Sequence, residues 1–283
     1  MATHVLTLSC PDRPGLVHAV SGWVVSAGGN ILDSQQFSDM AEQMFYLRLH
    51  VDFGDSSGTV DALTSGFAPV AAVHGMDFQF VVAETPLRTL VLVSKEGHCL
   101  NDLLYRQSIG ALNITIPAVV SNHPDLERLA RSYDADFHHV PVTADTKAAA
   151  EARLLELIDE LDIDLVVLAR YMQILSDETC ATLDGRVINI HHSFLPSFKG
   201  AKPYHQAHDR GVKLIGATAH YVTAELDEGP IIAQAVTPVD HRMTPADLAG
   251  AGRDVESQTL SRAVGLHATA RVIRSGHRTI VFD

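Results

Sequence analysis

Three short runs of consecutive apolar residues, separated by stretches with helical spacing, constrain the fold of this chain most. They are residues 88–94 (RTLVLVS), 114–120 (ITIPAVV) and 164–169 (DLVVLA), and residues 147–160 between the last two are strongly helical. A strand that is apolar at every position is covered on both faces, and its alternation with helices is typical of parallel sheets. This part of the chain is therefore predicted to form a doubly wound, mostly parallel, Rossmann-like sheet.

The first eighty residues follow a different pattern. Strand-like runs at 3–9, 31–37, 44–51 and 76–82 alternate with helical spacing from Leu16 and again over residues 55–73. The order βαββαβ predicts a ferredoxin-like sandwich with an antiparallel sheet. The boundary is expected at Glu84-Thr85-Pro86, which gives domains 1–84 and 85–283.

Composition narrows the functional classes. The chain has 283 residues, 46% of them hydrophobic, and a formal net charge of -13. This acidic balance argues against nucleic-acid binding, which depends on clustered Lys and Arg. No signal peptide and no apolar run of membrane-spanning length is present, so no membrane association is expected. The three cysteines lie far apart in the sequence and fit neither a disulfide framework nor a zinc site, so we predict a cytoplasmic protein. Because the histidines are scattered, we also predict no catalytic metal.

Polar side chains gather in residues 186–234. Asn189 and His191 lie two apart in a strand-like run and therefore share a face, close to where the strand ends. Asp227 follows in an acidic turn after the next apolar run. Each residue alone fits a structural role, as a strand cap or a turn carboxylate. Together they offer the groups needed for attack on a carbonyl.

The order of motifs in this region carries a resemblance. Asn189-x-His191, Ser193-x-Leu195-Pro196, His220-Tyr221-Val222-Thr223 and Leu226-Asp227-x-Gly229-Pro230 resemble the folate-dependent formyltransferase family. The strings at 200–207 (GAKPYHQA) and 216–220 (GATAH) are most similar to the formyltetrahydrofolate deformylases within it.

The resemblance implies hydrolysis of 10-formyltetrahydrofolate, which supplies formate for purine synthesis and balances one-carbon folate pools. Asn189 and protonated His191 would stabilise the oxyanion, and Asp227 would orient the attacking water and take its proton. No cofactor is implied, because the folate is the substrate. The implied folate-binding residues are Arg170, Met172, Gln173, Ile174, Leu175, Val222 and Glu225. His205 and His220 are candidate site-lining residues.

The first domain resembles an ACT domain. The resemblance implies an amino-acid effector, with methionine and glycine as candidates, held by Asp12, Arg13, Pro14, Gly15, Gly29, Asn30 and Ile31. Turn chemistry alone also explains Pro14 and Gly15, and both interpretations stay open. The exposed sheet edge predicts a homodimer or homotetramer.

Two other functions are considered. The first is a formyltransferase that uses an amine acceptor. An enzyme acting on tRNA would need a basic accessory domain, which we do not expect here. An enzyme acting on a phosphoribosyl amine would need a glycine-rich phosphate loop. Residues 94–98 (SKEGH) instead place a carboxylate where the phosphate would bind. A non-enzymatic amino-acid or folate sensor would have no need of Asn189, His191 and Asp227 together. Hydrolysis is therefore the preferred hypothesis.

Overall fold

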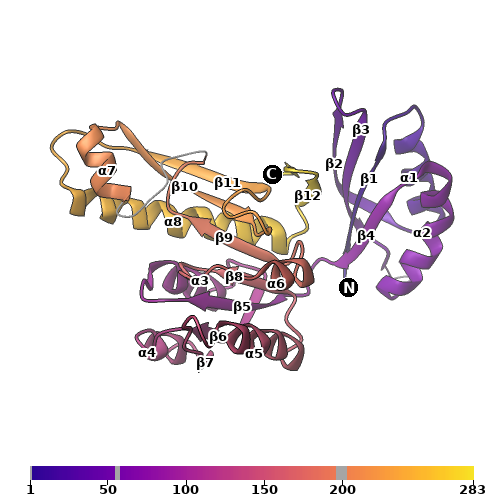
Figure 1. The fold of residues 1–283 in the computed structure, drawn as a ribbon. Coiled ribbons are helices and arrows are strands. Elements are labelled where there is room, and N and C mark those ends of the chain that lie inside the picture. Colours follow the sequence, from indigo (N-terminus) through magenta and orange to yellow (C-terminus); the bar gives the residue numbers. More distant parts are fainter. Residues whose placement is uncertain (1, 55–57, 196–202) are drawn as a thin grey trace. The chain divides into compact units, whose positions relative to one another are not determined.

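The computed structural model describes residues 2–54, 58–195 and 203–283. Contacts between Cα atoms divide the chain into two compact units. The first holds residues 1–85 together with 269–275 and 279–283, and the second holds residues 86–268 and 276–278. Each unit has its own sheet (Figure 1).

The first unit is the predicted βαββαβ sandwich. Its sheet has the order β2-β3-β1-β4, and every neighbouring pair is antiparallel. Apolar residues of α1 and α2 pack with those of β1 and β3 in one core. The predicted second helix begins at Val60, because the Thr59 side chain accepts a hydrogen bond from the Ala62 N–H and caps the helix. Residues 55–57, where that helix was expected to start, lie outside the described residues. The elements are β1 (His4–Pro11), α1 (Leu16–Ser26), β2 (Asn30–Asp39), β3 (Met44–Asp52), α2 (Val60–His74) and β4 (Asp77–Val82).

The C-terminal tail groups with this first unit, whereas the sequence assigned all of 85–283 to the second domain. Two short strands, β12 (Val272–Ser275) and β13 (Arg278–Val281), pair with each other. The buried guanidinium of Arg48 on β3 donates to the carbonyls of Thr269 and Ala270, each at 3.0 Å. Contacts so distant in the sequence leave no local pattern, so the tail could not be assigned from the sequence.

The second unit contains the predicted doubly wound sheet. Its strand order is β11-β10-β9-β8-β5-β6-β7, parallel from β9 to β7 and antiparallel at β10 and β11. The elements of its parallel part are β5 (Leu87–Val93), α3 (His98–Ser108), β6 (Ile114–Ser121), α4 (Glu127–Arg131), β7 (Asp136–His139), α5 (Lys147–Glu160), β8 (Leu165–Leu168), α6 (Asp177–Thr182) and β9 (Val187–His191). They are followed by α7 (Pro203–Arg210), β10 (Leu214–Tyr221), β11 (Ile231–Pro238) and α8 (Pro245–Ala268).

Helices cover both faces of this sheet. Leu90 and Leu92 on β5 pack with Leu154 and Leu157 of α5 on one face. The intervening Val91 and Val93 point to the opposite face, where α8 runs along β9, β10 and β11 and also contacts α3 (Figure 1). Continuous apolar runs are therefore needed in the central strands. In the part of the chain that the structure describes, no helix combines the length and apolar character that crossing a membrane requires.

Candidate active site

The carboxyl end of β9 carries two of the three predicted catalytic residues. Asn189 and His191 project from the same face of the strand, as their spacing predicts. The neighbouring strand β10 runs antiparallel, and its register places His220 directly opposite Asn189. Three polar side chains are thus brought to one edge of the sheet, where open α/β sheets bind their ligands.

Asp227 reaches this edge from the turn between β10 and β11. Its backbone is left-handed, with a φ of 59°, which is uncommon for a residue other than glycine. A side chain at Gly229 would collide with the carbonyl oxygen of Tyr221, so only glycine lets the turn fold back onto the end of β10. The hydrogen bond from the Tyr221 N–H to the Pro230 carbonyl, 2.9 Å long, closes the turn.

The structure brings the three predicted residues together. Nδ1 of His191 lies 3.1 Å from Oδ2 of Asp227, and Nδ2 of Asn189 lies 3.5 Å from the other carboxylate oxygen. The hydrogen bond from His191, followed by the contact with His220, holds the pKa of Asp227 well below its usual range. The carboxylate is therefore ionised at neutral pH and accepts a hydrogen bond from Nδ1 of His191.

His220 orients the amide of Asn189. Its Nδ1 lies 2.8 Å from the Tyr221 carbonyl, which can only accept, so this nitrogen carries a proton. In the neutral ring, Nε2 then accepts from the Asn189 amide at 3.3 Å. The same amide nitrogen also donates to Asp227 at 3.5 Å, so His220 and Asp227 together orient the Asn189 side chain.

A cavity of about 310 Å³ opens beside these residues. Its wall includes the trio, His220 and all seven residues predicted to bind folate. Met172 and Ile174 are 60% and 58% exposed, which is unusual for large apolar side chains and typical of a binding surface. The predicted folate residues in the wall are Arg170, Met172, Gln173, Ile174, Leu175, Val222 and Glu225.

Buried polar contacts tether the loop that forms one wall of this cavity. The Ser94 hydroxyl at the end of β5 accepts from the Met172 N–H at 3.0 Å and donates to Asn122 at 2.7 Å. Farther along the loop, the Glu151 carboxylate accepts from the Ser176 N–H at 3.1 Å. The loop is thus fixed at both ends by hydrogen bonds to strands and to α5.

The two histidines predicted to line the site differ in their position relative to the cavity. His220 is 2% exposed and lines the cavity. His205 is exposed on α7 and is not among the described residues that line it. Residues 200–202 of the resemblance motif, including Lys202, lie outside the described residues.

The sequence did not identify a buried polar cluster behind His191. It consists of Glu256 on α8, His98 at the start of α3, Tyr204 on α7 and Arg170 and His192 after β8 and β9. Strand alternation would have turned His192 away from His191, but β9 ends at His191 and the two rings stack instead. Glu256 falls in an otherwise regular helical pattern, so only its burial distinguishes it.

Two members of this cluster, together with the neighbouring Cys99, have the composition of a metal site. Ligand atoms of His98, Cys99 and Glu256 lie within 4.8 Å of one another. However, Nε of Arg170 lies 3.5 Å from Oε2 of Glu256, and burial raises the pKa of the Cys99 thiol far above its usual range. A neighbouring cation and a protonated thiol fit a hydrogen-bonded cluster rather than a metal centre.

The first unit has a separate cavity of about 370 Å³ at its first βα turn. Of the predicted effector residues, Asp12, Arg13 and Gly15 line it, while Pro14, Gly29, Asn30 and Ile31 do not. Gly29 has a packing role, because a Cβ there would lie 2.8 Å from Phe53 and from Val24. Ile31 packs against the core of the sandwich.

Comparison with known proteins agrees with this architecture. The Formyl transferase family pattern matches residues 87–264. The chain is 55% identical to a formyltetrahydrofolate deformylase from Corynebacterium sp. (strain P-1), over 98% of this chain and 97% of the relative. The crystal structure of a formyltetrahydrofolate deformylase from Burkholderia mallei ATCC 23344 superposes with a TM-score of 0.94 and 48% identity, covering 100% of both chains.

A second kind of relative covers less of the chain. Glycinamide ribonucleotide transformylase 1 from Symbiobacterium toebii matches with a TM-score of 0.66 and 35% identity, over 70% of this chain and 95% of that one. The formyltetrahydrofolate deformylases match nearly the whole chain, whereas the transformylase matches 70% of it. The chain therefore belongs to the formyl transferase family and, within it, to the formyltetrahydrofolate deformylases.

Proposed function

We propose that this protein hydrolyses 10-formyltetrahydrofolate to tetrahydrofolate and formate, with Asn189, His191 and Asp227 as the catalytic residues. The observation that carries the proposal is the 3.1 Å contact between His191 and Asp227 at one end of a cavity with exposed apolar walls. An apolar wall suits the flat pterin ring, and the polar end suits the formyl group. Formate released in this way would supply purine synthesis and balance the folate pools.

Each of the three residues has a distinct task in the proposed reaction. Water attacks the formyl carbon, and the negative charge that develops on the formyl oxygen is met by the side-chain amide of Asn189 and by protonated His191. The carbon–nitrogen bond then breaks, one proton of the water passes to the folate nitrogen, and formate leaves. A donor of this kind typically stabilises the transition state, and so lowers the barrier, by about 2.7–4 kcal/mol.

Asp227 acts chiefly by holding charge and water. Because its pKa lies well below the usual range, it is a weak proton acceptor in the resting site. Its ionised carboxylate can hold His191 protonated and accept a hydrogen bond from the attacking water. We therefore assign it orientation and electrostatic support first, and proton transfer only as the water becomes acidic during attack.

Water is the proposed acceptor because the loop after β5 is unsuited to a phosphorylated amine. The side chain of His98 at the start of α3 turns to the buried carboxylate of Glu256, 2.8 Å away, and Glu96 lies beside it. Two carboxylates at this helix start would repel a phosphate. The mechanism needs only water and protein side chains, so we propose no cofactor or metal.

The direct test is to supply the protein with 10-formyltetrahydrofolate and no amine. We expect formate and tetrahydrofolate to appear in equal amounts and to accumulate over many turnovers. Tight binding of the folate without formate release would refute the hydrolase and favour a transferase or a sensor.

The first unit is proposed to bind a small amino acid at the cavity near Asp12 and Arg13. The Arg13 guanidinium donates to the Val73 carbonyl at 2.8 Å, which places a cation at the cavity wall and suits a carboxylate ligand. Methionine and glycine are the candidates, and a homodimer or homotetramer is the proposed assembly. The three described cysteines are buried and unpaired, which fits the reducing cytoplasm.

The effector proposal is tested by thermal unfolding with and without each amino acid. A ligand at 100 times its Kd stabilises the folded state by about 2.7 kcal/mol, so the true effector should raise the Tm. Asp12→Ala should abolish the rise. An unchanged Tm with both amino acids would remove them as effectors.

A further inference from the structure

A buried carboxylate anchors the side chains behind His191. Glu256 lies within α8 and is 1% exposed. Its two oxygens accept from the Tyr204 hydroxyl at 2.7 Å and from His98 at 2.8 Å. Burial tends to raise the pKa of Glu256, but these hydrogen bonds and the charge of Arg170 outweigh it and lower the pKa. An ionised carboxylate in this position needs a cation, and Arg170 supplies it.

Arg170 links this anchor to the histidines. Its Nε lies 3.5 Å from Glu256, and its Nη1 donates to Nδ1 of His192 at 2.9 Å. Its backbone is left-handed, with a φ of 65°. A non-glycine residue in that region is maintained only where its surroundings compensate for the strain, commonly at functional sites. The guanidinium is thus held by fixed contacts on two sides, although the residue lines the folate cavity.

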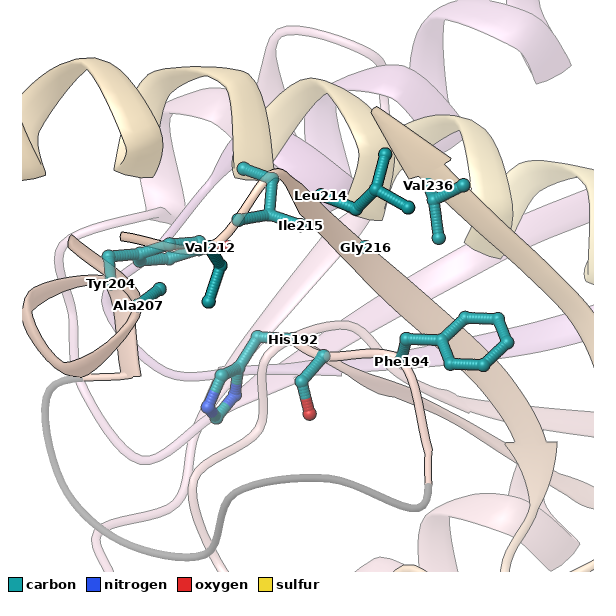
Figure 2. A pocket seen from close by; sticks show the side chains of 10 residues that line it. His192, Phe194, Tyr204, Ala207, Val212, Leu214, Ile215, Gly216 and Val236 are labelled. Carbon is teal, nitrogen blue, oxygen red and sulfur yellow. The ribbon is translucent and has the colours of Figure 1, made fainter. Parts of the chain in front are cut away.

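His192 in turn lies flat against His191. The ring centroids are 4.8 Å apart with an interplanar angle of 21°. His192 also lines a second cavity of about 440 Å³, together with Tyr204 and Phe194 (Figure 2). On that side, among the residues that the structure describes, the ring of His192 lines this cavity. The bond from Arg170 is therefore the polar contact that fixes its orientation within the described residues.

We propose that Arg170 is a positioning residue for catalysis: anchored by Glu256, it holds His192 in one orientation against His191 and so keeps His191 directed at Asp227. This proposal rests on the proposed function. It assigns Arg170 an action on the rate of the chemical step, in place of the folate contact that the family resemblance implies.

Charge gives a second reason for this arrangement. The groups that face His192 are Arg170, His191, Glu256 and Asp227. Burial, followed by Arg170 and His191, lowers the pKa of His192 to about 4. His192 is therefore neutral at neutral pH, and the proposed mechanism assigns its positive charge to the neighbouring ring of His191. Without Arg170 one of the charges that lower the pKa of His192 is lost while burial remains, so this pKa would rise part of the way from about 4 towards the ordinary value. Protonation of His192 at acidic pH would then place a positive ring face to face with His191.

The test compares Arg170→Met with the parent in steady-state hydrolysis of 10-formyltetrahydrofolate from pH 5 to pH 8. We expect kcat to fall by about tenfold to a hundredfold, because a small displacement of a catalytic group is enough to slow the reaction to that extent. KM should change little. Between pH 7 and pH 5 the activity of the variant should fall more steeply than that of the parent. Guanidinium ion at millimolar concentration should restore part of kcat, and sodium ion at the same concentration should not.

A second pair of variants guards against simple misfolding. Arg170→Lys keeps the charge but not the paired geometry of the guanidinium, and we expect it to fold normally and to lose kcat less severely than Arg170→Met. Gly252→Ala displaces Tyr204 from Glu256, because an added Cβ would collide with the tyrosine hydroxyl. It should lower kcat without raising KM. Arg131→Met, which removes a surface ion pair on α4, is the matched control and should behave like the parent.

The outcomes separate the two proposals. If the parent releases no formate, the proposed function fails. If the parent is active and Arg170→Met raises KM with kcat and its pH profile unchanged, Arg170 is a folate-binding residue and the positioning proposal is overturned. Loss of kcat in a folded variant, with recovery by guanidinium, supports it.

Discussion

Asp227 is the carboxylate that both histidines of the candidate site contact. It contacts His191 at 3.1 Å and His220 at 3.6 Å, and its left-handed backbone holds it there. Asn189, by contrast, offers a neutral amide that His220 orients. In the proposed mechanism Asp227 supports His191 and the attacking water, whereas Asn189 meets the oxyanion, and substitutions should separate the two roles.

Asp227→Asn should lower kcat by about 100-fold or more while folate binding stays close to that of the parent, because charge support for His191 is lost and the cavity wall keeps its shape. The measurement is single-turnover hydrolysis combined with folate titration. Asn189→Ala is the companion variant and should also reduce kcat much more than affinity. Near-normal turnover of Asp227→Asn would remove the role assigned to Asp227, and a pure loss of affinity in Asn189→Ala would make Asn189 a pocket residue.

At the scale of elements, the turn between β10 and β11 decides whether the site forms. β9 supplies Asn189 and His191 at its end simply by alternation, but Asp227 arrives only because the turn folds back onto Tyr221. Gly229 permits that close approach. Sequence spacing could place Asp227 in a turn, whereas its distance to His191 depends on this backbone contact.

Gly229→Ala should therefore shift the turn and separate Asp227 from His191. We expect a loss of about 1–3 kcal/mol in the free energy of unfolding, as for other overpacking substitutions, together with a large fall in kcat. Gly250→Ala is the control, since a Cβ there meets no atom within 4 Å and lies in the α8 helix. Urea unfolding and steady-state kinetics of both variants give the measurement. A Gly229→Ala protein as active as the control would show that the turn tolerates a side chain.

At the scale of the whole molecule, the chain returns to its first unit after completing the second. Residues 269–275 and 279–283 group with the N-terminal sandwich, and Arg48 binds the carbonyls of Thr269 and Ala270. The Tyr46 hydroxyl reaches Ser275 at 2.6 Å in the same unit. These hydrogen bonds join the tail to the first unit.

Arg48→Met should loosen the tail from that unit. Removing a buried donor from two carbonyls is expected to cost about 1–3 kcal/mol in the free energy of unfolding. Hydrogen exchange of residues 269–283 should accelerate, and kcat should stay close to that of the parent because Arg48 lies outside the candidate site. Unchanged exchange in the tail would show that the arginine does not secure it.

The sequence by itself determined both folds, because each depends on local patterns. Apolar runs specify strands covered on two faces, helical spacing specifies the helices between them, and the spacing of Asn189 and His191 puts both on one face at a strand end. The seven predicted folate residues came from the family resemblance and not from a local pattern, and all of them line one cavity. The roles of these residues remain predictions.

Tertiary structure decided what no local pattern contains. It set the contact of Asp227 with His191, the exposure of His205 away from the cavity, the return of the tail, and the cluster that joins Arg170 and His192 to Glu256. Such contacts join residues far apart in the chain, and their geometry depends on how strands and helices pack. A buried Glu256 and a surface glutamate look alike in a helical pattern, and only the packing of α8 tells them apart.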